Sequence, residues 1–156
     1  MESMNVSEMS VFFGNALKNI AYEMAGVELI DTVPGDIAAE RKFSVIVGIV
    51  GAHKGRVLLC MGDNFVQKIT EEMNCGKLDS LTDTTLYIGE FSNILIGKAI
   101  SQINNACKTF DLRLTPPAIF SGKRMRIITP ELQSSILSFT SQFGPASMDV
   151  GFERCR

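Results

Sequence analysis

The longest regular pattern in the chain is a helical stretch that runs from about Thr84 to Thr109. At about 100° per residue, one side of this helix gathers apolar residues: Ile88, Leu95, Ala99, Ile103, Ala106 and Phe110. The opposite side is mostly polar: Glu90, Asn93, Gly97, Ser101, Asn104, Asn105 and Lys108. A helix with one apolar side needs a second layer to cover that side. We therefore expect this helix to pack on a sheet and to expose its polar side.

Candidate strands lie on both sides of this helix in the sequence. Residues 43–51 and 56–61 are β-rich, and the four residues between them are typical of a turn, so we expect an antiparallel hairpin. Pro130 and Gly144-Pro145 mark turns between later strands. Further strands are predicted near 27–30, 123–129, 133–141 and 147–153.

Two other helices are expected. The first runs from Ser7 to Ala25, with Gly26 as its stop, and the second begins at a cap formed by Asp63 or Asn64 and ends near Asn74. The whole pattern predicts an α+β fold in which long helices cover a mostly antiparallel sheet. A chain of 156 residues has the length of one domain, so we assign residues 1–156 to a single domain.

A weak internal similarity is visible at an offset of 83 residues. It aligns Gly14-Asn15-Ala16 with Gly97-Lys98-Ala99, and Pro34 with Pro117. In this alignment Glu90 and Asn93 correspond to Ser7 and Ser10, so only the second half carries an acid and an amide. Because glycine and proline are common, an internal pseudo-twofold duplication and a chance similarity both stay open.

Composition excludes several classes of function. Fifteen basic and seventeen acidic residues give a net charge of −2 without a basic stripe, so nucleic acid and anionic membranes are not expected as partners. The longest apolar run, Val45–Val50, is too short to span a bilayer. The first residues, Met1 to Asn5, lack the features of a signal peptide, so we expect a cytoplasmic protein.

The cysteines do not indicate a metal site or a cofactor site. Cys60, Cys75, Cys107 and Cys155 form no C-x-x-C pair, and His53, in an apparent turn, is the only histidine. Four scattered thiols and one imidazole do not make a recognisable zinc site. We expect buried, reduced thiols, because free cysteine behaves as a small apolar residue.

An acid and an amide on the long helix are the candidate functional residues. Glu90 and Asn93 are three residues apart and therefore share one helical face. Pro116 follows Asn93 with 22 residues between them. The same E-x-x-N pattern at residues 2–5 and 71–74 has no proline at the matching position. We expect the pair on the exposed surface, and the ordinary alternative is a solvated helix face without a function.

Gly97 lies one turn beyond Asn93 and is unfavourable inside a helix. A glycine there costs about 1 kcal/mol of helix stability relative to alanine. Close approach by a partner or by another helix would offset that cost. Gly97 is therefore a candidate supporting residue of the same site.

These elements together resemble the CheX, CheC and FliY family of chemotaxis phosphatases, and CheX most closely. The family pattern is Asp or Ser, three residues, Glu, two residues, Asn, 22 residues, then Pro. The chain matches it at Glu90, Asn93 and Pro116, within I-G-E-F-S-N at 88–93 and T-P-P-A-I-F-S-G at 115–122. The segment V-I-V-G-I-V-G at 45–51 is also similar. The first position of the pattern departs from the family, because it is Leu86 here.

The resemblance implies a CheX-like domain that hydrolyses the aspartyl phosphate of a CheY-like response-regulator receiver domain in two-component signalling. Glu90 would dock the partner by pairing with its active-site lysine, and Asn93 would orient the attacking water. Pro116 would shape the support beneath the helix. The receiver would contribute Mg²⁺, so the chain would need no cofactor of its own. A homodimer is also implied.

Two other functions are compatible with the same resemblance. The first is a non-catalytic signalling adaptor that binds receiver domains and lost activity with the change at Leu86. The second is a structural component of the flagellar switch. Only the enzyme would lose turnover while keeping its fold when Asn93 is changed to alanine.

Overall fold

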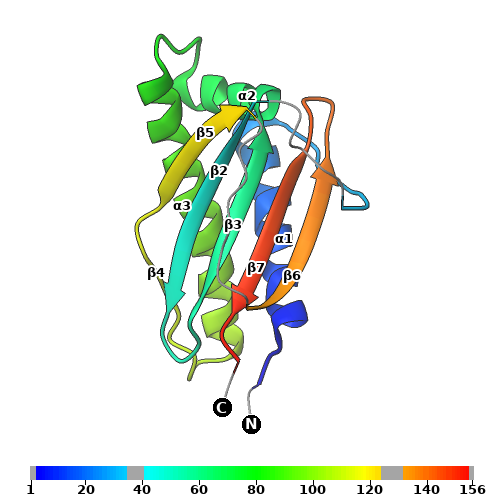
Figure 1. Cartoon of the computed structure of the whole chain (residues 1–156), viewed down its shortest axis with the longest axis vertical. Coiled ribbons are helices and arrows are strands. Elements are labelled where there is room, and N and C mark those ends of the chain that lie inside the picture. The colour runs from blue at the N-terminus through cyan, green and yellow to red at the C-terminus, as the bar shows by residue number, and fades with distance from the viewer. Residues whose placement is uncertain (1–2, 35–40, 124–131, 155–156) are drawn as a thin grey trace.

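Three helices pack against one face of a seven-stranded sheet in the computed structural model, which describes residues 3–34, 41–123 and 132–154 (Figure 1). The helices are α1 (Val6–Ala25), α2 (Asp63–Asn74) and α3 (Leu81–Ala106). The strands are β1 (Ile30–Asp31), β2 (Arg41–Val50), β3 (Gly55–Gly62), β4 (Arg113–Leu114), β5 (Ala118–Lys123), β6 (Gln133–Thr140) and β7 (Ala146–Phe152). The α+β fold expected from the sequence is confirmed.

The sheet is antiparallel at each of its pairings. Its order is β1-β6-β7-β3-β2-β4, and β5 also pairs with β2, beyond β4 along the same edge. The hairpin predicted between residues 43 and 61 is formed by β2 and β3, with Phe43 opposite Met61 and Ile49 opposite Gly55. Strands β3 and β7 pair at the centre of the sheet and join its two halves.

The strand order has an internal twofold symmetry. The elements α1, β1, β2 and β3 correspond in order to α3, β4, β6 and β7. If each element is replaced by its counterpart, the strand order β1-β6-β7-β3-β2-β4 reads the same in reverse. Each short strand pairs with the other half, β1 with β6 and β4 with β2. At the offset of 83 residues, β1 aligns with β4. Buried positions of the two long helices align as well: Met9 with Ser92, Phe13 with Ile96, Ala16 with Ala99, Leu17 with Ile100 and Ile20 with Ile103. The pseudo-twofold arrangement is therefore present in the fold.

The core lies between the sheet and the two long helices. Large side chains of α1 and α3 are fully buried, among them Phe13, Leu17, Phe91 and Leu95. Alternate residues of β3, namely Val57, Leu59 and Met61, are buried against them. Burial of this kind is the main favourable term in folding, and it fixes α3 against the sheet along its length.

The helix ends differ from the prediction by a few residues. Helix α3 begins at Leu81 rather than near Thr84, because the Ser80 hydroxyl accepts a hydrogen bond from the Asp83 N–H at 3.2 Å. Helix α2 begins after Gly62 without a side-chain cap, so the predicted cap at Asp63 or Asn64 is wrong. Asp63 instead lies in the first turn, where a carboxylate interacts favourably with the positive end of the helix dipole.

Two strands also begin and end at residues other than those predicted. Strand β5 begins at Ala118, directly after two prolines, whereas the sequence pattern placed a strand near 123–129. Residues 124–129 of that prediction, and Pro130, lie outside the described residues. The first short strand is Ile30–Asp31, not 27–30, because only these two residues reach the end of β6 to pair. Val27 and Leu29 contribute to the core instead.

Two of the described cysteines do not fit the expectation of buried thiols. Cys107 is buried, but Cys60 is partly exposed on β3 and Cys75 is exposed. Cys75 is the C-terminal cap of α2 and has a left-handed backbone. Cys155 lies outside the described residues. His53 lies in the turn between β2 and β3 and packs edge-on against Phe110, with ring centroids 4.4 Å apart.

Candidate functional site

Glu90 and Asn93 both lie well inside α3, the longest helix of the described chain. The helix is anchored at its start by the Ser80 cap and along its length by buried side chains. The geometry of a site on a packed helix is fixed more precisely than that of a site on a loop. The predicted acid and amide are therefore presented from a rigid support.

The two side chains differ in burial. Glu90 is exposed, whereas Asn93 is half-buried. Within the described part of the chain, Glu90 takes part in none of the ion pairs. Its carboxylate is therefore available to a positively charged group on another molecule.

Asn93 holds its side-chain oxygen in an unusual environment. This oxygen is buried, and none of the described residues donates a hydrogen bond to it. A buried acceptor without a donor costs about 1–3 kcal/mol. Such groups are rare in folded proteins, and function is one of the reasons for which they are kept.

A segment that lies far away in the sequence runs beside Asn93. Gly89 and Gly97 flank Asn93 at one helical turn on each side. A Cβ atom at Gly89 would lie 3.0 Å from Ile119 Cδ1, and one at Gly97 would lie 3.7 Å from Leu114 Cδ2. The chain from Leu114 to Ile119 therefore passes along this side of α3. Its passage explains why Asn93 is half-buried.

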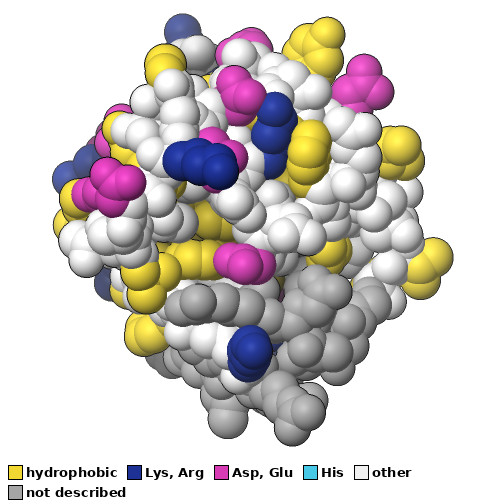
Figure 2. Space-filling model, turned by 90° about the horizontal axis from the view of Figure 1, so that it is seen from above, with side chains coloured by type: hydrophobic (Ala, Val, Ile, Leu, Met, Phe, Trp, Pro, Cys, Tyr) yellow, Lys and Arg dark blue, Asp and Glu magenta, His cyan; other side chains and the backbone are white. Residues whose placement is uncertain are grey.

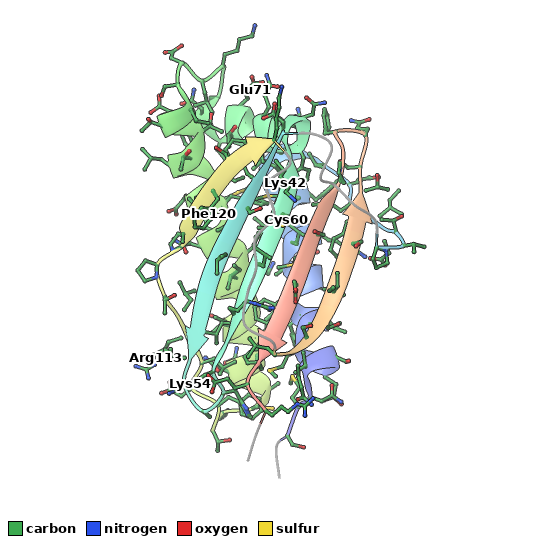
Figure 3. The ribbon with its side chains drawn as sticks, in the orientation of Figure 1. Lys42, Lys54, Cys60, Glu71, Arg113 and Phe120 are labelled. Atoms are coloured by element: carbon green, nitrogen blue, oxygen red, sulfur yellow. The ribbon has the colours of Figure 1, made fainter. Side chains whose placement is uncertain are left out.

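This segment contains a β-bulge. Ile49 pairs with Leu114, and Ile46 pairs with Ala118. The two residues of β2 that lie between these positions, 47 and 48, therefore face three residues, 115–117. One extra residue in an edge strand is a bulge, which bends the strand. Pro116 is exposed within it, where a missing N–H costs no ladder hydrogen bond. Figure 3 shows Arg113 on β4 and Phe120 on β5, the strands on either side of the bulge.

The return of this segment corrects two expectations. Asn93, predicted on the exposed side of the helix, is half-buried because the segment covers that flank. A Cβ atom at Gly97 would be in ordinary van der Waals contact with Leu114, so crowding within the chain does not account for this glycine, and its supporting role stays a prediction. Asn104, also predicted as exposed, is partly buried and bonds both the N–H and the carbonyl of Leu112, at 2.8 and 2.9 Å.

Leu86 lies one turn before Glu90 and is 68% exposed. It offers no hydroxyl or carboxylate at the position where the family pattern has one. The neighbouring Thr85 does not replace it, because its hydroxyl donates to the carbonyl of Leu81 at 2.8 Å. The helix therefore presents an apolar side chain, an acid and an amide in sequence.

A hollow of about 280 Å³ lies elsewhere, between α2 and the start of α3. Its lining includes Phe43, Thr70 and Leu81, and neither Glu90 nor Asn93. Figure 2 shows the end of the molecule above the sheet, where acidic, basic and scattered apolar side chains are interspersed. Glu90, by contrast, projects from an exposed helix surface. Such a position suits contact with a macromolecule.

The described part of the chain contains no group of three or more His, Cys, Asp or Glu residues that could hold a metal ion. In the same residues, no helix has both the length and the apolar character needed to cross a membrane.

Solved structures of chemotaxis proteins share this fold. CheX from Vibrio vulnificus is 28% identical, with a TM-score of 0.83 over 97% of this chain and 100% of that one. A CheC-like superfamily protein from Shewanella sp. PV-4 is 27% identical, with a TM-score of 0.81 over 97% and 100%. A CheX–CheY–BeF3–Mg²⁺ complex from Borrelia burgdorferi matches at 19% identity, with a TM-score of 0.75 over 96% and 100%. The fold is that of the CheX and CheC-like chemotaxis proteins.

The family assignment follows from the sequence itself. The sequence model of the family described as "Chemotaxis phosphatase CheX" matches residues 43–140, which contain Glu90, Asn93 and Pro116. This match covers more than half of the chain, and the chain belongs to the CheX family of chemotaxis phosphatases. No curated protein sequence matches it.

Proposed function

We propose that this protein hydrolyses the aspartyl phosphate of a CheY-like receiver domain. The observation that carries the proposal is the arrangement of Glu90 and Asn93 on one rigid helix, beside the bulge that contains Pro116. The family is described as a phosphatase, and a structure of the same fold was solved as a complex with CheY. An exposed helix face suits a substrate that is itself a folded protein.

Glu90 is proposed to dock the receiver. Its carboxylate is exposed and forms no ion pair within the described residues. A lysine beside the phosphoryl group of the receiver would form a charge-assisted hydrogen bond with it. That contact would place α3 directly over the phosphorylation site.

Asn93 is proposed to orient the attacking water. The Asn93 side-chain oxygen is buried, so the NH2 group is the part of the amide proposed to hold the water molecule in a defined direction. The water oxygen attacks phosphorus, the bond from phosphorus to the aspartate oxygen breaks, and inorganic phosphate leaves. Catalysis of such a step depends mainly on positioning. A Mg²⁺ ion bound by the receiver would neutralise charge on the phosphoryl oxygens.

The competing proposal is a receiver-binding adaptor without activity. Leu86 favours it, because the helix presents an apolar side chain in place of the Asp or Ser of the family pattern. The adaptor and the enzyme would bind the same partner. They differ only in whether the bound phosphoryl group is hydrolysed faster.

The test is dephosphorylation of a phosphorylated receiver domain in Mg²⁺, with wild type, Glu90→Ala and Asn93→Ala. We expect wild type to accelerate decay and both folded variants to lose the acceleration. Asn93→Ala should still bind the receiver, whereas Glu90→Ala should bind it weakly. Binding by wild type without faster decay would establish the adaptor. A protein that neither binds nor dephosphorylates several receivers would contradict both functions.

Three further properties are proposed from the family resemblance. Residues 1–156 would form one CheX-like domain, which would act in the cytoplasm as a homodimer. Sedimentation velocity of the whole chain tests the dimer, since a single species with the mass of one chain at micromolar concentration would contradict it.

A further inference from the structure

A pair of hydrogen bonds holds the bulge onto β2. The N–H of Thr115 donates to the carbonyl of Gly48 at 2.9 Å. The N–H of Gly48 donates in return to the hydroxyl oxygen of Thr115, also at 2.9 Å. In a regular ladder this second bond would go to a backbone carbonyl. Here a side chain replaces it, and we call this pair the Thr115–Gly48 clasp.

Gly48 is matched to this side chain. A Cβ atom at position 48 would lie 2.8 Å from Thr115 Oγ1 and 3.3 Å from Thr115 Cγ2. A glycine inside a strand weakens the strand, and it often marks a bulge or a close approach. The clasp therefore requires both a glycine on β2 and a hydroxyl on the bulge.

The rest of the bulge has no donors of its own. Pro116 and Pro117 both lack a backbone N–H, so neither can donate to β2. Thr115 is consequently the residue of the three-residue bulge that can donate to the ladder. Without the Thr115 hydroxyl, only one of the two hydrogen bonds that hold this segment on β2 would remain.

The bulge in turn forms the flank of the proposed site. The segment from Leu114 to Ile119 passes the side of α3 that carries Gly89, Asn93 and Gly97. Along this flank the side-chain oxygen of Asn93 is buried and receives no hydrogen bond from a described residue. With no such bond, the amide depends on packing for its orientation. A bulge next to a functional group is a known means of aiming a side chain.

We propose that Thr115 and Gly48 are positioning residues, which fix the orientation of the Asn93 amide by holding the bulge against α3. As far as the reaction is concerned, this inference rests on the proposed phosphatase function. Thr115 is not proposed to touch the phosphoryl group. Its contribution is to keep the water-orienting amide from shifting, and a shift of about 1 Å can cost about a hundredfold in rate.

The kinetic test compares Thr115→Val, which keeps the shape and removes the hydrogen bond, with Thr115→Ser, which keeps the hydroxyl. Thr140→Val is the matched control, because Thr140 is an exposed threonine on β6. With a phosphorylated receiver in Mg²⁺, we expect Thr115→Val to lower kcat by about tenfold to a hundredfold and to leave KM within about twofold. Thr115→Ser should recover most of kcat, and Thr140→Val should resemble wild type.

A second readout needs no activity. In ¹⁵N NMR spectra, Thr115→Val should shift the side-chain amide resonances of Asn93 and speed hydrogen exchange at the Gly48 N–H. Thr115→Ser and Thr140→Val should leave both unchanged. Gly48→Ala, which would crowd Thr115, should reproduce the effect of Thr115→Val on Asn93.

The two readouts separate the possible failures. If wild type is active and Thr115→Val keeps full kcat with unmoved Asn93 resonances, the positioning role is overturned. A fall in kcat without recovery in Thr115→Ser overturns it too, since the hydroxyl would not be the cause. If wild type does not dephosphorylate any receiver, the proposed function fails and the role in the reaction fails with it. The Asn93 resonances then still decide whether the clasp orients the amide.

Discussion

The hydroxyl of Tyr87 donates a 2.8 Å hydrogen bond to the side-chain oxygen of Asn74, and so links α3 to the end of α2. The amide nitrogen of Asn74 bonds in turn to the carbonyls of Gly76 and Lys77, each at 3.2 Å. One asparagine thus joins the loop between the helices to α3. The link lies one turn before Glu90, close to the proposed docking surface but outside it.

Removal of this hydroxyl in Tyr87→Phe should lower stability without changing the site. The variant leaves the Asn74 oxygen without its donor, and we expect a loss of about 1 kcal/mol in the free energy of unfolding. Urea unfolding measures it, with Tyr22→Phe as the control because Tyr22 is 58% exposed. Equal stability of the two variants would show that the link contributes nothing.

The two glycines that flank Asn93 should respond differently to alanine. A Cβ at Gly97 would meet Leu114 at an ordinary 3.7 Å, so Gly97→Ala should gain up to about 1 kcal/mol from helix propensity. A Cβ at Gly89 would lie 3.0 Å from Ile119, which must move, so Gly89→Ala should gain less or lose stability.

Thermal or urea unfolding of both variants decides this prediction, and each is the control for the other. We also expect Gly97→Ala to keep receiver binding, because the glycine faces the chain's own Leu114. Weaker binding by Gly97→Ala at unchanged stability would instead indicate that a partner approaches the helix there, as the sequence first suggested.

Much of the fold follows from local sequence patterns. The apolar period of the long helix and the β-rich runs around the 52–55 turn predict their elements correctly, because both signals are contained in short windows. Several polar residues precede α3, so a short window does not distinguish its cap, which is Ser80 in the structure. The start of β5 at Ala118 does not follow from the local pattern, because it comes directly after two prolines, which lack ladder donors and are tolerated only in an edge strand.

The surroundings of the site depend on contacts that no short window contains. The spacing of Glu90, Asn93 and Pro116 identifies the candidate residues but does not show what lies beside them. Half-burial of Asn93 arises from a strand that returns along α3, which a helical projection cannot include. The clasp joins Gly48 to Thr115, 67 residues apart, through a register shift of one residue. Gly48 inside a β-rich run is typical of a bulge or a close approach, but no short window identifies Thr115 as its partner.

Replacement of Leu86 tests whether its departure from the family pattern limits activity. Leu86 is largely exposed, so Leu86→Ser should change the free energy of unfolding by no more than about 0.5 kcal/mol. We expect turnover of the phosphorylated receiver to rise, because a hydroxyl can form a hydrogen bond at this end of the helix face. Val11→Ser on α1 is the control, since Val11 is another exposed apolar residue. Lower turnover with a higher KM in Leu86→Ser would mean that leucine itself contacts the receiver.

Glu90→Gln tests the docking role by removing the charge and keeping the shape. A hydrogen bond to a charged group is worth about 1.5–3 kcal/mol, so KM for the phosphorylated receiver should rise by about tenfold to a hundredfold. Added salt should weaken binding by wild type more than by the variant, because screening acts on the ion pair. Glu28→Gln is the control, because it replaces another exposed glutamate and has the same net charge as Glu90→Gln, and it should behave as wild type. If the two variants bind the receiver equally well and with equal salt dependence, Glu90 does not pair with a lysine of the partner.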